Sequence, residues 1–441
     1  MPNTRGGPSD ALLPPGKPFR AAGLLALFVL FGATLLNGYS VLTHEQVVDL
    51  LWKDQIQPLL LQRFPHSTED ELRKAHAYAY GGSVMQDMGY YPFGSQYFSD
   101  LVHYVRTGDF VEALLRDSSD INEFAFALGA LAHYSSDNQG HPTINRVVAM
   151  EFPKLKAKFG NEVTYVDDPK AHIRTEFGFD MVQVAKNRYT SDRYHDFIGF
   201  EVAKPLMQRA VLETYDLKLE DIFGDVDLAI GSYRRAVSKI IPQMTRIALL
   251  SRRDEIIKDT PNFDKKKFLY YLSRTDYQRE WGKGYRRPGF GARILALILK
   301  LLPKVGPFKA VAFKIPTPQT EDMYIKSVDQ TVENYSSLLQ KEKSRHLDLP
   351  DTDCDTGRPA AAGEYRLADK TYARLLDDLS NKPTSPVPAE LRSNILRYYS
   401  NLNAPIETKK DHKAWSKLLA ELASLQRQPD QAPSVQPVGV R

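Results

Sequence analysis

Residues 128–142, LGALAHYSSDNQGHP, limit most strongly what this chain can form. His133 and Asp137 lie four residues apart in an apolar helical pattern, so their side chains share one helix face and could bind one metal ion. The apolar residues before them indicate a buried helix, in which an imidazole and a carboxylate need partners to offset desolvation. Gly140 is predicted to end this helix, and His141 follows it. The alternative is a core helix in which His133 and Asp137 only satisfy each other.

The periodicity of the chain predicts an all-α protein. Strand-like alternation is scarce, and apolar residues recur at helical spacing, as in a multi-helix bundle. The first predicted helix runs from Thr43, which forms a capping box with Gln46, to Phe64, and the second runs from Ser67 to about Tyr80, where Gly81 and Gly82 end it. A third helix has its N-cap at Ser99, a fourth runs from Asn122 to Ser136, and a fifth begins at Pro169. The last runs from Leu228 to Leu250 with a kink at Pro242.

Histidines and carboxylates are concentrated in the first half of the chain. Seven of the ten histidines lie between positions 44 and 172. Imidazole and carboxylate donors without thiolate suit zinc in a hydrolytic site, and eight donors are too many for one tetrahedral ion. Cys354 is the only cysteine, so the chain offers neither an intramolecular disulfide nor a cysteine-based zinc site. The candidate ligands are His44, Asp87, His103, His133, Asp137, His141, His172 and Glu176.

The order of these eight residues resembles the zinc-dependent phospholipase C family. The series includes the HxxxD pair of His133 and Asp137 and the HxxxE pair of His172 and Glu176. Each pair alone is a weak signal, and the ordered series of eight ligands is the specific one. The resemblance covers about residues 39–250, and the single-strand-specific nucleases share the same fold and trinuclear arrangement. His103 is the expected ligand after Asp87, and His76 is the alternative if the loop between them folds differently.

The resemblance implies a helical bundle with three zinc ions. In the family, the third ion binds the α-amino group and carbonyl of the mature first residue, which here is Tyr39. Tryptophan is usual at that position, and Tyr39 departs from it, although the binding groups belong to the backbone. The implied sites are Asp87, His103, His133 and Asp137 for the first ion; His141, His172 and Glu176 for the second; and Tyr39, His44 and Asp137 for the third.

This ligand set implies phosphodiester cleavage. Two ions that share Asp137 would lower the pKa of a water molecule toward neutrality and supply hydroxide, and the ions would neutralise charge on the phosphoryl oxygens. Asp87 and Asp137 are the candidate catalytic residues, with Asp87 placed to orient or deprotonate the water. The predicted activity is hydrolysis of a glycerophospholipid to diacylglycerol and a phosphorylated head group. The alternatives are a single-strand-specific zinc nuclease and a metal-stabilised protein without turnover.

The N-terminus predicts export. Basic residues precede Ala21–Leu36, an uncharged apolar run that is short for a membrane span and typical of a secretory signal. Residues 1–38 are therefore predicted to be a signal peptide, cleaved after Gly38, of a secreted or periplasmic protein. An uncleaved membrane anchor is the alternative. Cleavage would expose the amino group of Tyr39 and so complete the site.

The rest of the chain is more basic and then more polar. Residues 39–250 form the expected catalytic domain, and 251–348 a basic, aromatic helical extension in which 292–305 could lie in a lipid interface. The alternative for 292–305 is a core helix flanked by solvated lysines. Residues 349–388 are predicted to be a linker and 427–441 a loose tail, with helices between them.

The formal charge falls from +4 to +2 without residues 1–38, which makes nucleic acid a poor expected partner. The sequence leaves the oligomeric state open.

Overall fold

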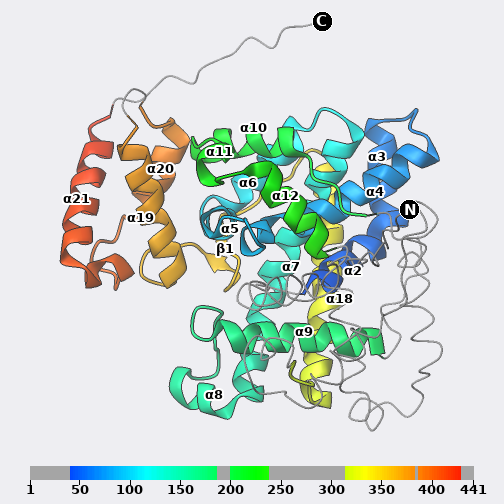
Figure 1. Ribbon diagram of the computed structural model, residues 1–441, viewed down its shortest axis with the longest axis horizontal. Coiled ribbons are helices and arrows are strands. Elements are labelled where there is room, and N and C mark those ends of the chain that lie inside the picture. The colour runs from blue at the N-terminus through cyan, green and yellow to red at the C-terminus, as the bar shows by residue number, and fades with distance from the viewer. Residues whose placement is uncertain (1–39, 186–198, 238–312, 383–385, 429–441) are drawn as a thin grey trace, which may run out of the picture.

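The computed structural model describes residues 40–185, 199–237, 313–382 and 386–428 (Figure 1). In these residues nearly all regular structure is helical, and the one sheet pairs two short antiparallel strands, β1 (Thr352–Asp353) and β2 (Arg358–Pro359). The predicted all-α fold class is confirmed. None of the described helices is both long and apolar enough to cross a membrane.

The helices follow one another closely along the chain. In chain order they are α2 (Val41–Leu51), the π-helical turn η1 (Trp52–Ile56), α3 (Gln57–Arg63), α4 (Glu69–Ser83), the 3-10 turn η2 (Met85–Tyr90), α5 (Gln96–Tyr104), α6 (Thr107–Asp117), α7 (Ile121–Glu151), α8 (Pro153–Phe159), α9 (Pro169–Ala185), α10 (Lys204–Tyr215), α11 (Leu219–Ile222), α12 (Val226–Arg235), α18 (Pro318–Lys343), α19 (Arg366–Ser380), α20 (Ala389–Tyr398), η5 (Glu407–Lys410) and α21 (His412–Gln426).

Helix α7 is the centre of the fold. It begins after Asp120, whose carboxylate accepts hydrogen bonds from two backbone N–H groups of the first turn, and it continues for 31 residues. The prediction that Gly140 ends the helix was wrong, because α7 passes through both Gly140 and Pro142. The second half of α7 buries Ile144 and Val148 in an apolar cluster with α9 and α18. This burial outweighs the local preference of glycine and proline to stop a helix.

Helix α4 crosses α7 at very short range. A Cβ atom at Gly82 would lie 2.0 Å from the carbonyl oxygen of Phe126, and one at Gly129 would lie 2.1 Å from that of Ala79. The prediction that Gly81 and Gly82 end this helix was therefore wrong. They lie inside α4, where the absence of a side chain allows the two helix backbones to meet.

Three predicted helix starts were also wrong. The first helix begins at Val41, so Thr43 lies inside it and donates a hydrogen bond to Asp180 in place of forming a capping box. The second begins after Thr68, which forms a capping box with Glu71, and not at Ser67. Ser99 lies inside α5 and binds the backbone of η2, so it is not an N-cap.

The C-terminal part of the chain packs on the N-terminal helices. Helix α18 runs beside α7 and α2, and the Tyr335 hydroxyl donates to the carbonyl oxygen of Leu128 at 2.9 Å (Figure 1). The prediction of a linker was wrong for residues 349–380, because β1 lies against α5 and α6, and α19 packs on α5. The main core cluster contains both Val41, near the start of the described chain, and Leu425, near its end.

Several predictions concern residues outside the described part of the chain. These are the signal peptide 1–38 with its apolar run, Tyr39, the end of the predicted helix 228–250 with Pro242, the segment 292–305 and the tail from 429. The described start of that helix is α12, which ends at Arg235.

Candidate metal centre

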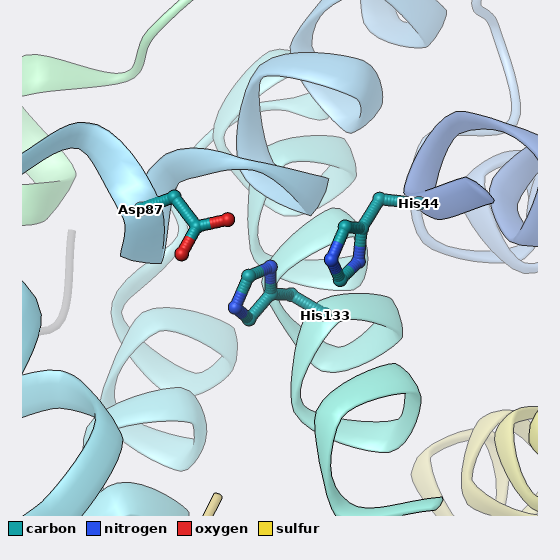
Figure 2. Close-up of side chains that lie close together, drawn as sticks. All are labelled: His44, Asp87 and His133. Carbon is teal, nitrogen blue, oxygen red and sulfur yellow. The ribbon is translucent and has the colours of Figure 1, made fainter. Parts of the chain in front are cut away.

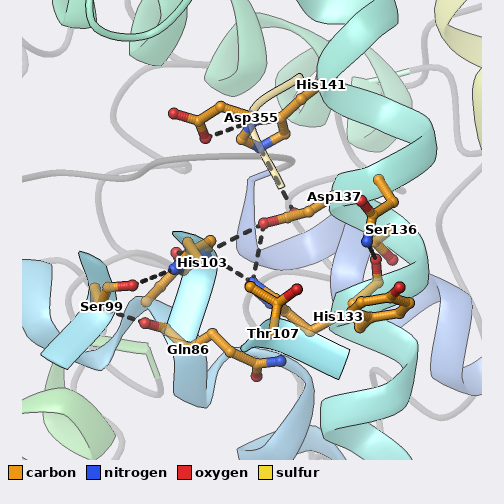
Figure 3. A network of polar contacts seen from close by, with 12 residues as sticks. Gln86, Ser99, His103, Thr107, His133, Ser136, Asp137, His141 and Asp355 are labelled. Carbon is orange, nitrogen blue, oxygen red and sulfur yellow. Dashed lines mark hydrogen bonds and ion pairs between the residues drawn. The ribbon is translucent and has the colours of Figure 1, made fainter. Parts of the chain in front are cut away.

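Four imidazole rings converge on the carboxylate of Asp137. Figure 3 labels three of them, His103, His133 and His141. The Nε2 atoms of His103 and His133 lie 3.2 and 3.1 Å from Asp137 Oδ2. The Nε2 atoms of His44 and His141 both lie 3.6 Å from Asp137 Oδ1. All five side chains are at most 1% exposed. Helices α2, α5 and α7 therefore bring each oxygen of one carboxylate to two imidazoles.

Backbone carbonyl groups fix two of these rings. His103 Nδ1 lies 2.7 Å from the carbonyl oxygen of Ser99, and His133 Nδ1 lies 2.9 Å from that of Ser83. Because a carbonyl oxygen can only accept, Nδ1 carries the proton in both rings and Nε2 keeps its lone pair. The two Nε2 atoms lie 3.2 Å apart beside Asp137. Acceptor atoms that face one another in a buried site are the arrangement that a cation would satisfy.

Asp87 adds a second carboxylate to this cluster. It lies in η2, is fully buried, and neither of its oxygens has a hydrogen-bond partner among the described residues. Its Oδ1 atom is 3.5 Å from His103 Nε2. Figure 2 shows Asp87, His44 and His133 directed toward one another from three different elements. A buried carboxylate without a donor is costly unless a cation binds it.

Two overlapping groups have ligand atoms close enough together to hold a metal ion. They are His44, Asp87 and His133, and His103, His133 and Asp137. His133 belongs to both groups, so the candidate sites are adjacent. The donor set of imidazole nitrogen and carboxylate oxygen fits zinc.

The electrostatics of the cluster are those of a site built for positive charge. Burial raises the pKa of Asp87 well above its usual range. Burial also opposes the charge of Asp137, but His133 and His141 hold the pKa of this carboxyl well below its usual range. Burial would lower the pKa of His141, and Asp137 with other carboxylates raises it to about 10. Burial lowers the pKa of His44.

The pair His172 and Glu176 lies on α9, as the predicted four-residue spacing requires. His172 Nδ1 is 3.2 Å from Glu176 Oε1, and its Nε2 donates to the carbonyl oxygen of Val163 at 2.5 Å. Glu176 Oε2 is buried without a hydrogen-bond partner. Among the described residues, neither group at metal-binding distances includes this pair or His141. The second predicted ligand set is thus present on α7 and α9 but not drawn together to ligand distances.

Two other residues were expected at or near the site, His76 and Tyr39. His76, the alternative to His103, lies apart from Asp137: its Nε2 is 2.9 Å from Asp49, and its ring stacks on Trp52. Tyr39, the expected terminal ligand, lies outside the described residues.

Sequence reasoning missed one residue in this centre, Asp355. Its Oδ1 atom lies 2.9 Å from His141 Nδ1, and its side chain is fully buried. It belongs to an acidic stretch, DTDCDT at 351–356, in a region that composition assigned to a linker. No spacing relates Asp355 to the histidines, so only the fold could reveal the contact.

The fold and the centre together define an all-α protein with a buried cluster of imidazoles and carboxylates that could hold a metal ion. Residues 43–223 match the family model described as zinc dependent phospholipase C. Over these residues the chain is similar to the zinc-dependent phospholipase C family, whose members are phosphoric diester hydrolases. No curated protein and no solved structure matches the chain.

Proposed function

We propose that this protein hydrolyses glycerophospholipids to diacylglycerol and a phosphorylated head group. The family supports a phospholipid phosphodiesterase. The observation that carries the proposal is the convergence of four imidazoles on the two oxygens of Asp137. Beside them lies Asp87, which has no hydrogen-bond partner among the described residues.

The described residues support distinct roles in this reaction. Asp87, His103, His133 and Asp137 would hold one ion. His44, beside Asp137, would contribute to a neighbouring site. Bound zinc would supply an acidic water molecule and neutralise charge on the phosphate. Asp87 would orient or deprotonate that water, because it is the carboxylate with a raised pKa beside His103.

Three ions remain the proposed stoichiometry. His141, His172 and Glu176 supply a further set of donors on α7 and α9, and Glu176 has a buried oxygen without a hydrogen bond. The third site would use His44, Asp137 and the backbone of Tyr39 once the signal peptide 1–38 has been removed. Export to the periplasm or the exterior therefore belongs to the proposal, as does contact of the basic segment 292–305 with a lipid surface.

The test combines metal analysis with two substrates. The exported protein is sequenced at its N-terminus, its metal content is measured by mass spectrometry, and it is incubated with mixed phospholipid vesicles or with single-stranded DNA. We expect about three zinc ions per chain, an N-terminus at Tyr39 and release of diacylglycerol. The D137N variant is the matched inactive control, since the amide cannot bridge two cations.

The outcomes separate the alternatives. DNA cleavage with intact lipid would identify a nuclease. Bound zinc without either activity would indicate a metal-stabilised protein without turnover, and a protein without zinc would refute the centre itself.

A further inference from the structure

The carboxylate of Asp355 is held in one position beside His141. Its Oδ2 atom accepts hydrogen bonds from the hydroxyl groups of Tyr104, at 2.9 Å, and of Tyr365. Its Oδ1 atom forms an ion-pair contact with His141 Nδ1, 2.9 Å away (Figure 3). Asp355 lies well beyond residues 43–223, which match the family.

The chain before Asp355 is docked on the junction of α5 and α6 by backbone hydrogen bonds. The Thr107 hydroxyl donates to the Thr352 carbonyl at 3.0 Å and accepts from the Thr352 N–H at 2.9 Å. The N–H of Cys354 donates to the carbonyl oxygen of His103 at 3.0 Å. The candidate ligand His103 is therefore hydrogen-bonded directly to the segment that carries Asp355.

Two more contacts fix Asp355 itself. Its N–H donates to Asp353 Oδ1 at 2.9 Å, which closes the turn after β1. Its carbonyl oxygen accepts from the Asn145 side chain at 2.9 Å, and Asn145 lies one turn beyond His141 on α7. The carboxylate therefore has a fixed position relative to both α5 and α7.

His141 lies between two carboxylates. Nδ1 faces Asp355, and Nε2 lies 3.6 Å from Asp137 Oδ1. His103 and His133 have the same arrangement, except that a backbone carbonyl group takes the place of Asp355. A carboxylate on one imidazole nitrogen keeps the proton there, orients the ring and makes the other nitrogen a stronger metal ligand.

We propose that Asp355 is a positioning residue of the metal centre, which keeps the proton of His141 on Nδ1 and so presents Nε2 as a zinc ligand beside Asp137. The proposal rests on the zinc centre of the proposed function. It means that the C-terminal part of the chain, outside the family match, completes that centre.

The test measures zinc retention in the full-length protein. Zinc-loaded wild type and D355N are equilibrated with increasing chelator, and the zinc left per chain is measured by mass spectrometry. We expect D355N to lose one ion at a chelator concentration about 10- to 100-fold lower than wild type. H141A should lose the same ion, and D355N should have no further effect in the H141A background, because the carboxylate acts only through that ring.

Two variants separate positioning from general destabilisation. Asp369 is a buried carboxylate that accepts hydrogen bonds from the Tyr398 hydroxyl at 2.7 Å and from the backbone N–H groups of Gly363 and Glu407. D369N should lower the melting temperature and retain zinc like wild type. Y365F keeps the Asp355 carboxylate but removes one of its donors, so it should give a smaller shift even if D355N fails to fold.

The visible absorption spectrum of the cobalt-substituted protein gives a second readout, which should change in D355N and not in D369N. Two results would overturn the proposal. One is zinc retention in D355N equal to that of wild type, and the other is a further loss of zinc when D355N is added to H141A. A wild-type protein that binds no zinc would reject the proposed function first, and the two failures are therefore distinguishable.

Discussion

At the residue scale, four of the five candidate histidine ligands have one ring nitrogen next to an acceptor outside the metal cluster. His103, His133 and His172 each direct one ring nitrogen at a backbone carbonyl, and His141 directs one at Asp355. The second nitrogen of each ring then faces a carboxylate. The donors of the centre are thus arranged before a metal ion arrives, which lowers the entropy lost when it binds.

Substitution of two buried histidines should separate a ligand from a structural residue. H103Q should lose most of one zinc ion per chain and reduce phospholipid hydrolysis by at least about 100-fold, because Nε2 of His103 is one of the donors around Asp137. H76Q should retain zinc and lose about 1–3 kcal/mol of stability, because it breaks the contact with Asp49. Zinc content and chemical denaturation test both; a zinc-depleted H76Q would reverse the assignment.

The stability of the metal-free protein should depend on Asp100. Burial raises the pKa of this carboxyl to about 7, whereas in the unfolded chain it is about 3.9. Between these values the folded chain keeps a proton that the unfolded chain has lost, so this group makes the free energy of unfolding fall as pH rises. D100N should therefore gain about 3 kcal/mol over wild type between pH 4.5 and pH 8. If urea denaturation shows that the free energies of unfolding of wild type and D100N change with pH in the same way, Asp100 is not the cause.

At the scale of the elements, the crossing of α4 and α7 positions the ligands. Ser83 ends α4, and its carbonyl oxygen binds His133 of α7 at 2.9 Å. Gly82 and Gly129 allow the backbones to approach closely enough for this bond. The same contact also places η2, with Asp87, directly after the end of α4.

Adding one methyl group at this crossing should damage both the fold and the site. G129A should lower the free energy of unfolding by about 3 kcal/mol or more, because its Cβ would clash with backbone atoms of Ala79 that cannot move alone. G231A is the control: nothing lies within 4 Å of its added Cβ, and at this exposed position of α12 alanine should stabilise the helix by about 0.5–1 kcal/mol. Thermal and urea unfolding measure both. A G129A protein as stable as G231A would contradict the close packing.

The sequence predicted those parts of the site that depend on spacing within one helix. The four-residue intervals of His133 with Asp137 and of His172 with Glu176 occur on α7 and α9 as expected. Helix ends were predicted less well, since the buried contacts of Ile144 and the helix crossing at Gly82 outweigh local preferences. Asp355 was out of reach of sequence reasoning, because a tertiary contact alone relates it to His141.

At the scale of the whole molecule, the helices that carry the metal ligands share one core with the C-terminal helices. Tyr372 and Leu375 of α19 and Leu422 of α21 belong to the same buried cluster as Phe98 of α5. Asp351 accepts hydrogen bonds from the first N–H groups of α6. The segment that matches the family is therefore only part of the cooperative unit.

Removal of residues 349–441 should destabilise the entire protein. The truncated chain would expose the faces of α5 and α6 that now contact β1 and α19, and it would leave Tyr104 without its buried partner Asp355. We expect a melting temperature at least about 10 °C below that of the full chain, or insoluble protein. Circular dichroism and the soluble fraction measure this. A truncated protein that melts like the full chain would show that the C-terminal part is an independent unit.

The contact between Thr43 and Tyr324 spans 281 positions in the chain, and that between Tyr104 and Asp355 spans 251. Such separations slow folding, because a long loop must close before the contacts form. During synthesis, His44 and His133 leave the ribosome well before the segment that carries Asp355. We therefore expect the centre to assemble only after the chain is complete, and zinc uptake to follow chain release in time.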